Sequence, residues 1–212
     1  MAGKRARVRM TADQRREQLV GVARTLFAHK GYEATSIEEI ADRAGVSKPV
    51  VYQHFGGKAG IYRVVVDREV RHLTDSISRS FEAGHPRLVA EGAADAFLTY
   101  IEEREDGFRV LVRDAPTPIT GGSFASVIAN VATRAEQLLI AEFAERGFDE
   151  DSAPVYALML VGAVALVGEW WLDNRTQSRD KVAAHLVNLL WNGLRGLEPS
   201  PTTTTGGNRE SL

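Results

Sequence analysis

The chain contains no cysteine, which excludes a disulfide framework, a zinc site built on thiolates and a cysteine nucleophile. It also contains no G-x-S-x-G, no H-E-x-x-H and no phosphate-binding glycine loop, so the signatures of common hydrolases, metalloproteases and nucleotide-binding enzymes are missing. The five histidines show no close pairing at helical spacing, which argues against a metal site. We therefore expect no catalytic residues, no metal and no cofactor.

A long hydrophobic run is also lacking. The most apolar stretch, "VYALMLVGAVALVG" at residues 155–168, falls short of the roughly 20 residues that span a bilayer. The N-terminal "MAGKRARVR" is basic, but a polar segment follows it where a secretory signal needs an apolar one. We expect a cytoplasmic protein with no membrane partner.

Charge is distributed unevenly along the chain. Residues 1–60 hold eleven lysines and arginines against six acids, whereas the rest of the chain holds fifteen against twenty-two. A basic front on an acidic body suggests that the front meets a polyanion. The basic stretch "KRARVR" is either an arm that reaches DNA or a solvated tail, and composition leaves both readings open.

Apolar residues recur every three to four positions, and no stretch alternates for long as a strand does. The sequence therefore predicts an all-α fold. The final stretch, "EPSPTTTTGGNRESL", has almost no apolar side chains and is expected to be disordered. Helices, with their caps, are predicted over residues 11–31, 36–45, 47–56, 58–83, 86–104, 106–114, 123–146, 151–174 and 178–195.

The first three helices carry local start signals. Thr11 with Gln14, and Ser36 with Glu39, have the spacing of a capping box, in which each residue bonds the backbone of the other. Ser47 is placed to cap the third helix. The second and third helices are too short to be stable alone, since isolated helices below roughly 12 residues are marginal in water.

The turn between these two short helices, "AGVS", contains Gly45, which can take left-handed backbone angles. Two short helices joined in this way match the helix-turn-helix arrangement; a plain helical hairpin is the alternative. Donors, an apolar contact and an aromatic ring on the third helix suit the DNA major groove. The residues expected on this outward face are Lys48, Pro49, Val50, Tyr52, Gln53 and His54.

Residues 23–62, "ARTLFAHKGYEATSIEEIADRAGVSKPVVYQHFGGKAGIY", meet three consecutive patterns: G-[FY]-x-x-[TS]-[TS], I-A-x-x-A-G-V-S and [LV]-Y-x-[HY]-F-x-x-K. On these residues the chain resembles the TetR family of bacterial transcriptional regulators. The resemblance covers about residues 11–65, and the body agrees with the family in helix number and length alone.

The resemblance implies roles for individual residues. Base-edge contacts are expected from Lys48, Pro49, Val50 and Gln53, and phosphate contacts from Ser36, Tyr52, His54 and Lys58. Ser47 is also expected among the DNA-binding residues. Glu38 departs from the pattern, because an acid repels phosphate unless it accepts a hydrogen bond from a cytosine amine.

The expected organisation is a basic arm at residues 1–10, a three-helix DNA-binding domain at 11–57, a larger helical domain for effector binding and dimerisation at 58–197, and a tail at 198–212. Apolar residues in the larger domain line an effector pocket or simply form core. These pocket candidates are Phe97, Tyr100, Ile101, Phe108, Leu111, Phe124, Val127, Ile128, Val131, Tyr156 and Leu160.

The segment "VYALMLVGAVALVGEWWL" is apolar around more of its circumference than one core face needs. Together with the following helix it resembles the family's dimer interface, a four-helix bundle made by two subunits; the core of a large monomer is the alternative. The interface candidates are Trp170, Trp171, Leu186, Leu189 and Leu190.

The sequence thus predicts a homodimeric repressor that binds a pseudo-palindromic DNA operator and is released by a small, largely apolar effector. The passage "YIEEREDGFRVLVRDAP" at residues 100–116 loosely resembles family members that govern fatty-acid and acyl-CoA metabolism, so these are the candidate effectors. The alternatives are a DNA-binding regulator without an effector, and a helical enzyme.

Overall fold

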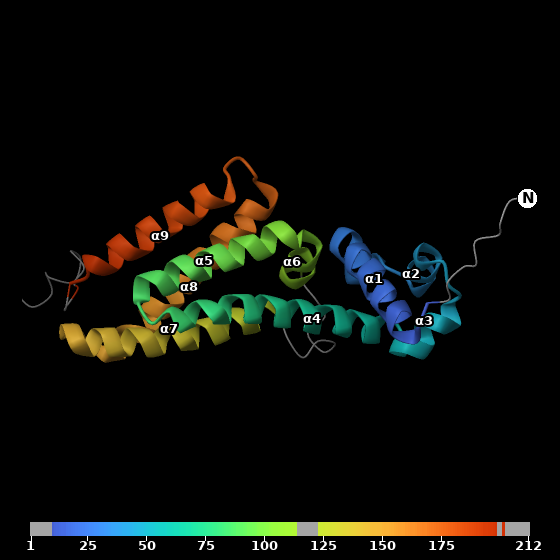
Figure 1. Ribbon diagram of the computed structural model, residues 1–212, viewed down its shortest axis with the longest axis horizontal. Helices are drawn as coiled ribbons and strands as arrows, with labels where there is room; N and C mark the ends of the chain where they lie inside the picture. Colours follow the sequence, from blue (N-terminus) through green and yellow to red (C-terminus); the bar gives the residue numbers. More distant parts are fainter. Residues whose placement is uncertain (1–9, 114–122, 199–200, 202–212) are drawn as a thin grey trace, which may run out of the picture. The chain divides into compact units, whose positions relative to one another are not determined.

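The computed structural model describes residues 10–113, 123–198 and 201, and the elements in these ranges are α-helices and two short 3-10 segments (Figure 1). The all-α prediction is confirmed. The predicted arm lies outside the described residues except for Met10, as does most of the predicted tail. The elements are α1 (Ala12–Ala34), α2 (Ile37–Ala44), α3 (Lys48–Phe55), α4 (Lys58–Ser78), η1 (Arg79–Ala83), α5 (Pro86–Glu103), α6 (Glu105–Val112), α7 (Phe124–Arg146), η2 (Glu150–Ser152), α8 (Ala153–Asp173) and α9 (Arg179–Arg195).

Most predicted helix ends lie within a few residues of the observed ones, because glycine, proline and capping residues act locally. The end predicted for the first helix is an exception. Gly31 has φ 82° and ψ 171°, which kinks α1, yet α1 resumes and reaches Ala34. The Thr35 hydroxyl closes this extra turn by donating to the Gly31 carbonyl at 2.8 Å.

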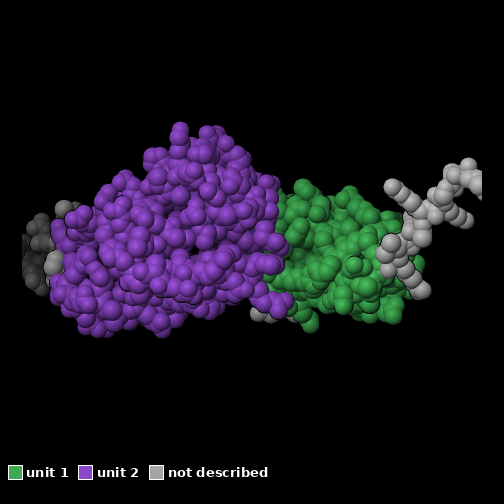
Figure 2. All heavy atoms as spheres, in the orientation of Figure 1, with its two compact units in different colours: residues 1–70, 106–123 green, residues 71–105, 124–212 purple. Residues whose placement is uncertain are grey.

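The described chain divides into two compact units (Figure 2). Unit 1 comprises residues 1–70 and 106–123, and unit 2 comprises residues 71–105 and 124–212. Helix α4 supplies residues to both units, and the boundary expected after residue 57 falls inside unit 1.

The core of unit 1 forms where α1 meets the short helices. Leu19 and Phe27 of α1 are buried, as are Ile40 of α2 and Val51 of α3. The ring of Tyr62 on α4 meets Phe27 edge-on, with centroids 4.9 Å apart. Burying a large apolar side chain contributes about 1.5–3 kcal/mol, so this packing supplies the stability that such short helices lack.

Polar side chains of α1 also secure the ends of the short helices. Gln18 donates to the Ala44 carbonyl at the end of α2, at 3.2 Å. Arg16 donates to the His54 carbonyl near the end of α3, at 2.8 Å, and its guanidinium lies 4.5 Å from the centroid of the Phe55 ring. These bonds satisfy carbonyls that have no partner within their own helix.

Helix α6 belongs to unit 1 because its first turn bonds to α1. The Asp106 carboxylate accepts from the Thr25 hydroxyl at 2.7 Å and lies 3.4 Å from His29.

An ion pair joins α1 to α4. Glu17 of α1 accepts two hydrogen bonds of 2.6 Å from Arg68 of α4. The hydrogen bonds from Arg68 hold the pKa of Glu17 below its ordinary value.

In unit 2, α7 packs along α8 and α5 packs along α9. Gly168 of α8 permits a close approach to Phe97 of α5, whose ring is stacked on Phe124 with centroids 6.0 Å apart. Trp171 is 2% exposed, and its indole donates to the Gln177 carbonyl at 2.9 Å.

Candidate nucleic-acid interface and apolar pocket

The turn between α2 and α3 depends on one glycine. Gly45 has φ 65° and ψ 39°, a left-handed conformation that costs glycine little. The backbone N–H of Val46 donates to the Ala41 carbonyl at 3.0 Å, which closes the end of α2. The predicted helix-turn-helix is therefore present, and α3 ends as expected at Gly56, with φ 72°.

The predicted caps have mixed outcomes. The capping box of Thr11 and Gln14 is confirmed, with both bonds present at 2.9 and 3.2 Å. Ser36 accepts from the Glu39 N–H at 3.1 Å, but the Glu39 carboxylate bonds to Lys30 at 2.6 Å, so the returning half of the second box is absent.

Ser47 occupies the N-cap position of α3, as predicted, but its side chain makes no capping hydrogen bond to the first turn. Pro49 stands in that first turn, where its missing N–H leaves one fewer donor to satisfy.

Helix α3 buries Val51 in the core of unit 1 and exposes a face of polar, apolar and aromatic side chains. Tyr52 is 53% exposed. Such a face offers hydrogen-bond donors, an amide and an aromatic hydroxyl that match the chemistry of DNA. Among the predicted contact residues, Ser36, Ser47, Lys48, Pro49, Tyr52 and Gln53 are exposed, while Val50, His54 and Lys58 are half-buried.

Glu38 and Lys48 form an ion pair between the first turns of α2 and α3. Both side chains are about half exposed, and the hydrogen bond from Lys48 holds the pKa of the Glu38 carboxyl below its ordinary value. Sequence spacing did not reveal this pair, because the two residues come together only when the turn is folded. It places a donor and an acceptor side by side on the outward face.

Lys58 holds the end of α1. Its ammonium donates to the carbonyls of Tyr32 at 3.0 Å and Glu33 at 3.2 Å, and it lies 4.3 Å from the centroid of the Tyr32 ring. An ammonium has three donors, so one remains for a phosphate. Ser36 similarly keeps its O–H donor, because its oxygen acts as the acceptor in the cap.

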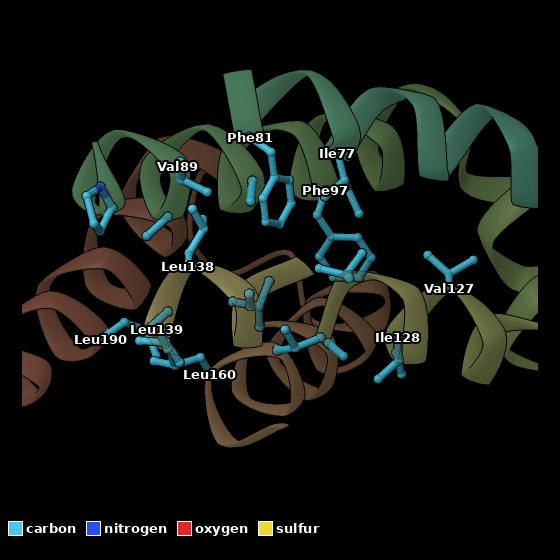
Figure 3. Close-up of a pocket in the computed structure, with 18 of the residues that line it drawn as sticks. Ile77, Phe81, Val89, Phe97, Val127, Ile128, Leu138, Leu139, Leu160 and Leu190 are labelled. Carbon is cyan, nitrogen blue, oxygen red and sulfur yellow. The ribbon is translucent and has the colours of Figure 1, made fainter. Parts of the chain in front are cut away.

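Unit 2 contains an apolar cavity of about 950 Å³ of empty space, including its mouth. Side chains from α4, η1, α5, α7, α8 and α9 line it (Figure 3). Six of the predicted pocket residues are in this lining: Phe97, Phe124, Val127, Ile128, Val131 and Leu160. Sequence reasoning missed further lining residues, including Ile77 of α4, Phe81 of η1, Val89 of α5, and Leu138 and Leu139 of α7. Leu190 of α9, predicted for the dimer interface, also lines the cavity.

The other five predicted pocket residues lie elsewhere. Tyr100 and Ile101 are buried on α5 without lining the cavity. Phe108 and Leu111 are buried in α6, which belongs to unit 1. Tyr156 packs edge-on against Phe143, with centroids 5.5 Å apart.

Helices α8 and α9 expose large apolar side chains. Among the predicted interface residues, Trp170 is 48% and Leu189 68% exposed, and Leu190 is half-buried. Trp171 and Leu186 are buried within unit 2 and therefore belong to its interior. The exposed residues of α8 that sequence reasoning missed are Val155, Leu158, Met159 and Leu166.

By length and composition alone, the segment Glu150–Asp173 is the one described helix that could cross a membrane. The core helix of a soluble protein passes the same test, so this is weak evidence for a span. Within the described ranges, no three histidine, aspartate or glutamate side chains are grouped so that they could hold a metal.

Comparison with known proteins agrees with this geometry. Residues 19–65 match the model of the family described as bacterial regulatory proteins, tetR family, and residues 87–193 match a tetracyclin repressor-like C-terminal domain. The HTH-type transcriptional activator FasR of Mycolicibacterium smegmatis is 34% identical over 197 residues, which cover 91% of this chain and 88% of that protein. The HTH-type transcriptional repressor KstR2 of Rhodococcus jostii is 25% identical, with 85% of this chain and 91% of that protein covered.

Solved structures share the fold. A TetR-like regulator from Rhodococcus sp. RHA1 has a TM-score of 0.71 at 24% identity, covering 89% of this chain and 100% of that one. The fatty acid degradation regulator FadR of Bacillus halodurans has a TM-score of 0.69 at 19% identity, covering 91% of this chain and 99% of that one. The helix-turn-helix geometry, the two family models and the full-length relative agree, and this chain belongs to the TetR family of DNA-binding transcriptional regulators.

Proposed function

We propose that this regulator acts in the cytoplasm as a homodimer on a pseudo-palindromic operator, and that a largely apolar effector releases it. The observation that carries the proposal is the outward face of α3, held by bonds from α1 to the ends of both short helices. A recognition helix needs such a rigid support, because base contacts depend on small displacements.

In this proposal, the exposed start of α3 enters the major groove. Base edges are contacted by Lys48, Pro49, Val50 and Gln53. The flanking phosphates are contacted by Ser36, Ser47, Tyr52, His54 and Lys58. A lysine that contacts guanine and an amide that contacts adenine each contribute about 1–3 kcal/mol of discrimination.

The dimer is proposed to form through the exposed apolar faces of α8 and α9. Leu166 of α8 is 67% exposed and Leu189 of α9 is 68% exposed, and large contiguous apolar surfaces mark interaction sites. A two-fold interface uses the same patch on both subunits, which requires no second partner. Two recognition helices related by a two-fold axis would read a site with matching symmetry.

The effector is proposed to occupy the apolar cavity of unit 2. Small-molecule sites are concave and lined mainly by apolar side chains, as this cavity is. The description of FadR as a fatty acid degradation regulator favours a fatty acid or acyl-CoA over other apolar compounds. FasR is named an activator, so the second candidate function is activation of transcription by the DNA-bound form, in place of repression.

Effector binding and DNA binding are coupled in this proposal. Helix α4 supplies residues to both units and is the candidate for transmission. A 100-fold loss of operator affinity requires about 2.7 kcal/mol of coupling, and reciprocity requires the operator to weaken effector binding by the same factor. Calorimetric titration of dodecanoyl-CoA, with and without operator DNA, tests the coupling. If dodecanoyl-CoA bound with equal affinity in both titrations, the proposed DNA-binding function would stand and the proposed effector switch would be contradicted.

A further inference from the structure

Trp191 of α9 stands where the apolar cavity meets two other hollows of unit 2. Its half-buried side chain lines the apolar cavity, an open groove between α5 and α9, and a smaller hollow. The apolar cavity and the smaller hollow also share Pro86, Leu139 and Leu194. The three spaces are therefore neighbours, separated in part by one indole ring.

Beyond Trp191 the lining changes from apolar to basic. Arg87 and Arg195 line the groove, and Arg195 also lines the smaller hollow. The guanidinium of Arg87 lies 6.0 Å from the Trp191 ring centroid, and the ring of His85 lies 5.8 Å from it. The lining of the apolar cavity contains no charged residue.

The groove keeps one positive charge in excess. Arg87 is paired with Glu91 at 2.8 Å, so these two charges largely offset each other. Arg195 is exposed, and no described residue bonds or pairs with its side chain. The remaining polar lining consists of Asn188 and Asn192, which bond to each other at 2.8 Å.

We infer that the effector is a single-chain anionic amphiphile, whose chain fills the apolar cavity and whose head lies beyond Trp191 on Arg195 and Arg87. The inference rests on the proposed effector function and specifies its chemistry. A charged head buried in the apolar cavity would lose its hydration without a partner, which is costly, so the head must leave the cavity. An arginine can then bind a carboxylate or phosphate through two parallel hydrogen bonds.

Two sources share this chemistry. A free fatty acid presents one carboxylate, which a single arginine satisfies. An acyl thioester of a nucleotide-bearing carrier presents phosphates and an aromatic base, which the arginines and the Trp191 ring suit. The groove can hold either head, so the source is separated by experiment.

The test measures binding of dodecanoate, dodecanol and dodecanoyl-CoA by calorimetry, each below its micellar concentration. The full chain is compared with its Arg195→Gln variant and with Lys181→Gln, a matched loss of an exposed cation on α9 outside the linings of these three hollows. Dodecanoate should bind the wild-type chain at least tenfold more tightly than dodecanol, and Arg195→Gln should reduce this ratio below threefold. Dodecanol affinity should be the same in all three proteins, which shows that the variants are folded.

The outcomes separate the two proposals. Dodecanoate and dodecanol binding with equal affinity, or a ratio unchanged by Arg195→Gln, would overturn the head-group site and leave the apolar effector pocket standing. If none of the three compounds bound, the effector proposal would fall as well. A thioester that binds tenfold more tightly than dodecanoate, with this excess lost in Arg87→Gln, would identify a nucleotide-bearing head; no excess would identify the free acid.

Discussion

Replacing Gly168 by alanine should force a buried ring of unit 2 to move. A Cβ at this position would lie 2.2 Å from Cε1 of Phe97 and 2.8 Å from Cδ1 of Ile101, both well inside van der Waals contact. Phe97 is buried and stacked on Phe124, so its ring can give way only toward the apolar cavity that it lines, at the expense of this stacking. Overpacking of this kind costs about 1–3 kcal/mol of folding stability.

The same substitution has an opposing effect that must be removed from the measurement. Alanine stabilises a helix interior by roughly 0.5–1 kcal/mol over glycine. The net change for Gly168→Ala is therefore destabilising by about 0–2.5 kcal/mol. The gain in helix propensity from Gly168→Ala is the same whether residue 97 is Phe or Leu. A double-mutant cycle with Phe97→Leu therefore isolates the free energy of the steric clash.

Urea unfolding of the wild-type chain, both single variants and the double variant gives the coupling energy. The tryptophans at positions 170, 171 and 191 all belong to unit 2, so their fluorescence follows this unit. Gly168→Ala should cost about 1–2 kcal/mol less in the Phe97→Leu background than in the wild type. Additive changes, within about 0.5 kcal/mol, would refute the close packing of α8 on α5.

Two further predictions concern the surfaces. Leu189→Glu should dissociate the proposed dimer in analytical ultracentrifugation, because the carboxylate would be buried at the interface at a cost of several kcal/mol. The control Leu88→Glu, at an exposed position of α5, should leave the dimer intact. A dimeric Leu189→Glu variant would remove α9 from the interface. Glu38→Gln should make binding to a scrambled duplex more dependent on salt, because Lys48 loses its neutralising partner. The slope of log K against log salt concentration should become steeper by about one. Equal slopes for the wild type and the variant would show that the ion pair has no role on DNA.

Local signals explain how much of the helix-turn-helix could be predicted. Gly45 and Gly56 end their helices through their own backbone conformation, and the capping box of Thr11 and Gln14 closes within one helical turn. Ser47 shows the limit of this reasoning, because a residue type that favours a cap does not require the bond to form. Such predictions depend on neighbours in sequence and not on tertiary contacts.

Predictions that depended on tertiary contacts were less complete. Phe108 and Leu111 of α6 were candidates for the pocket or the core, and both are buried outside the pocket. The attachment of α6 to α1 depends on Asp106 meeting Thr25, and these two residues are far apart in sequence. Trp170 and Trp171 are equally apolar, yet successive helical residues point about 100° apart, so one is 48% exposed and the other is buried. An all-round apolar helix offers no polar face from which to choose between them.

The central claim, that α3 reads DNA sequence, is tested most directly by selection from a random duplex library followed by sequencing. The wild-type chain should enrich a pseudo-palindrome. Lys48→Ala and Gln53→Ala should each lose preference at one or two base pairs, at mirror-related positions of both half-sites, by about 1–3 kcal/mol per position. A wild-type chain that enriches no sequence, or variants that retain the wild-type preference at every position, would contradict the account.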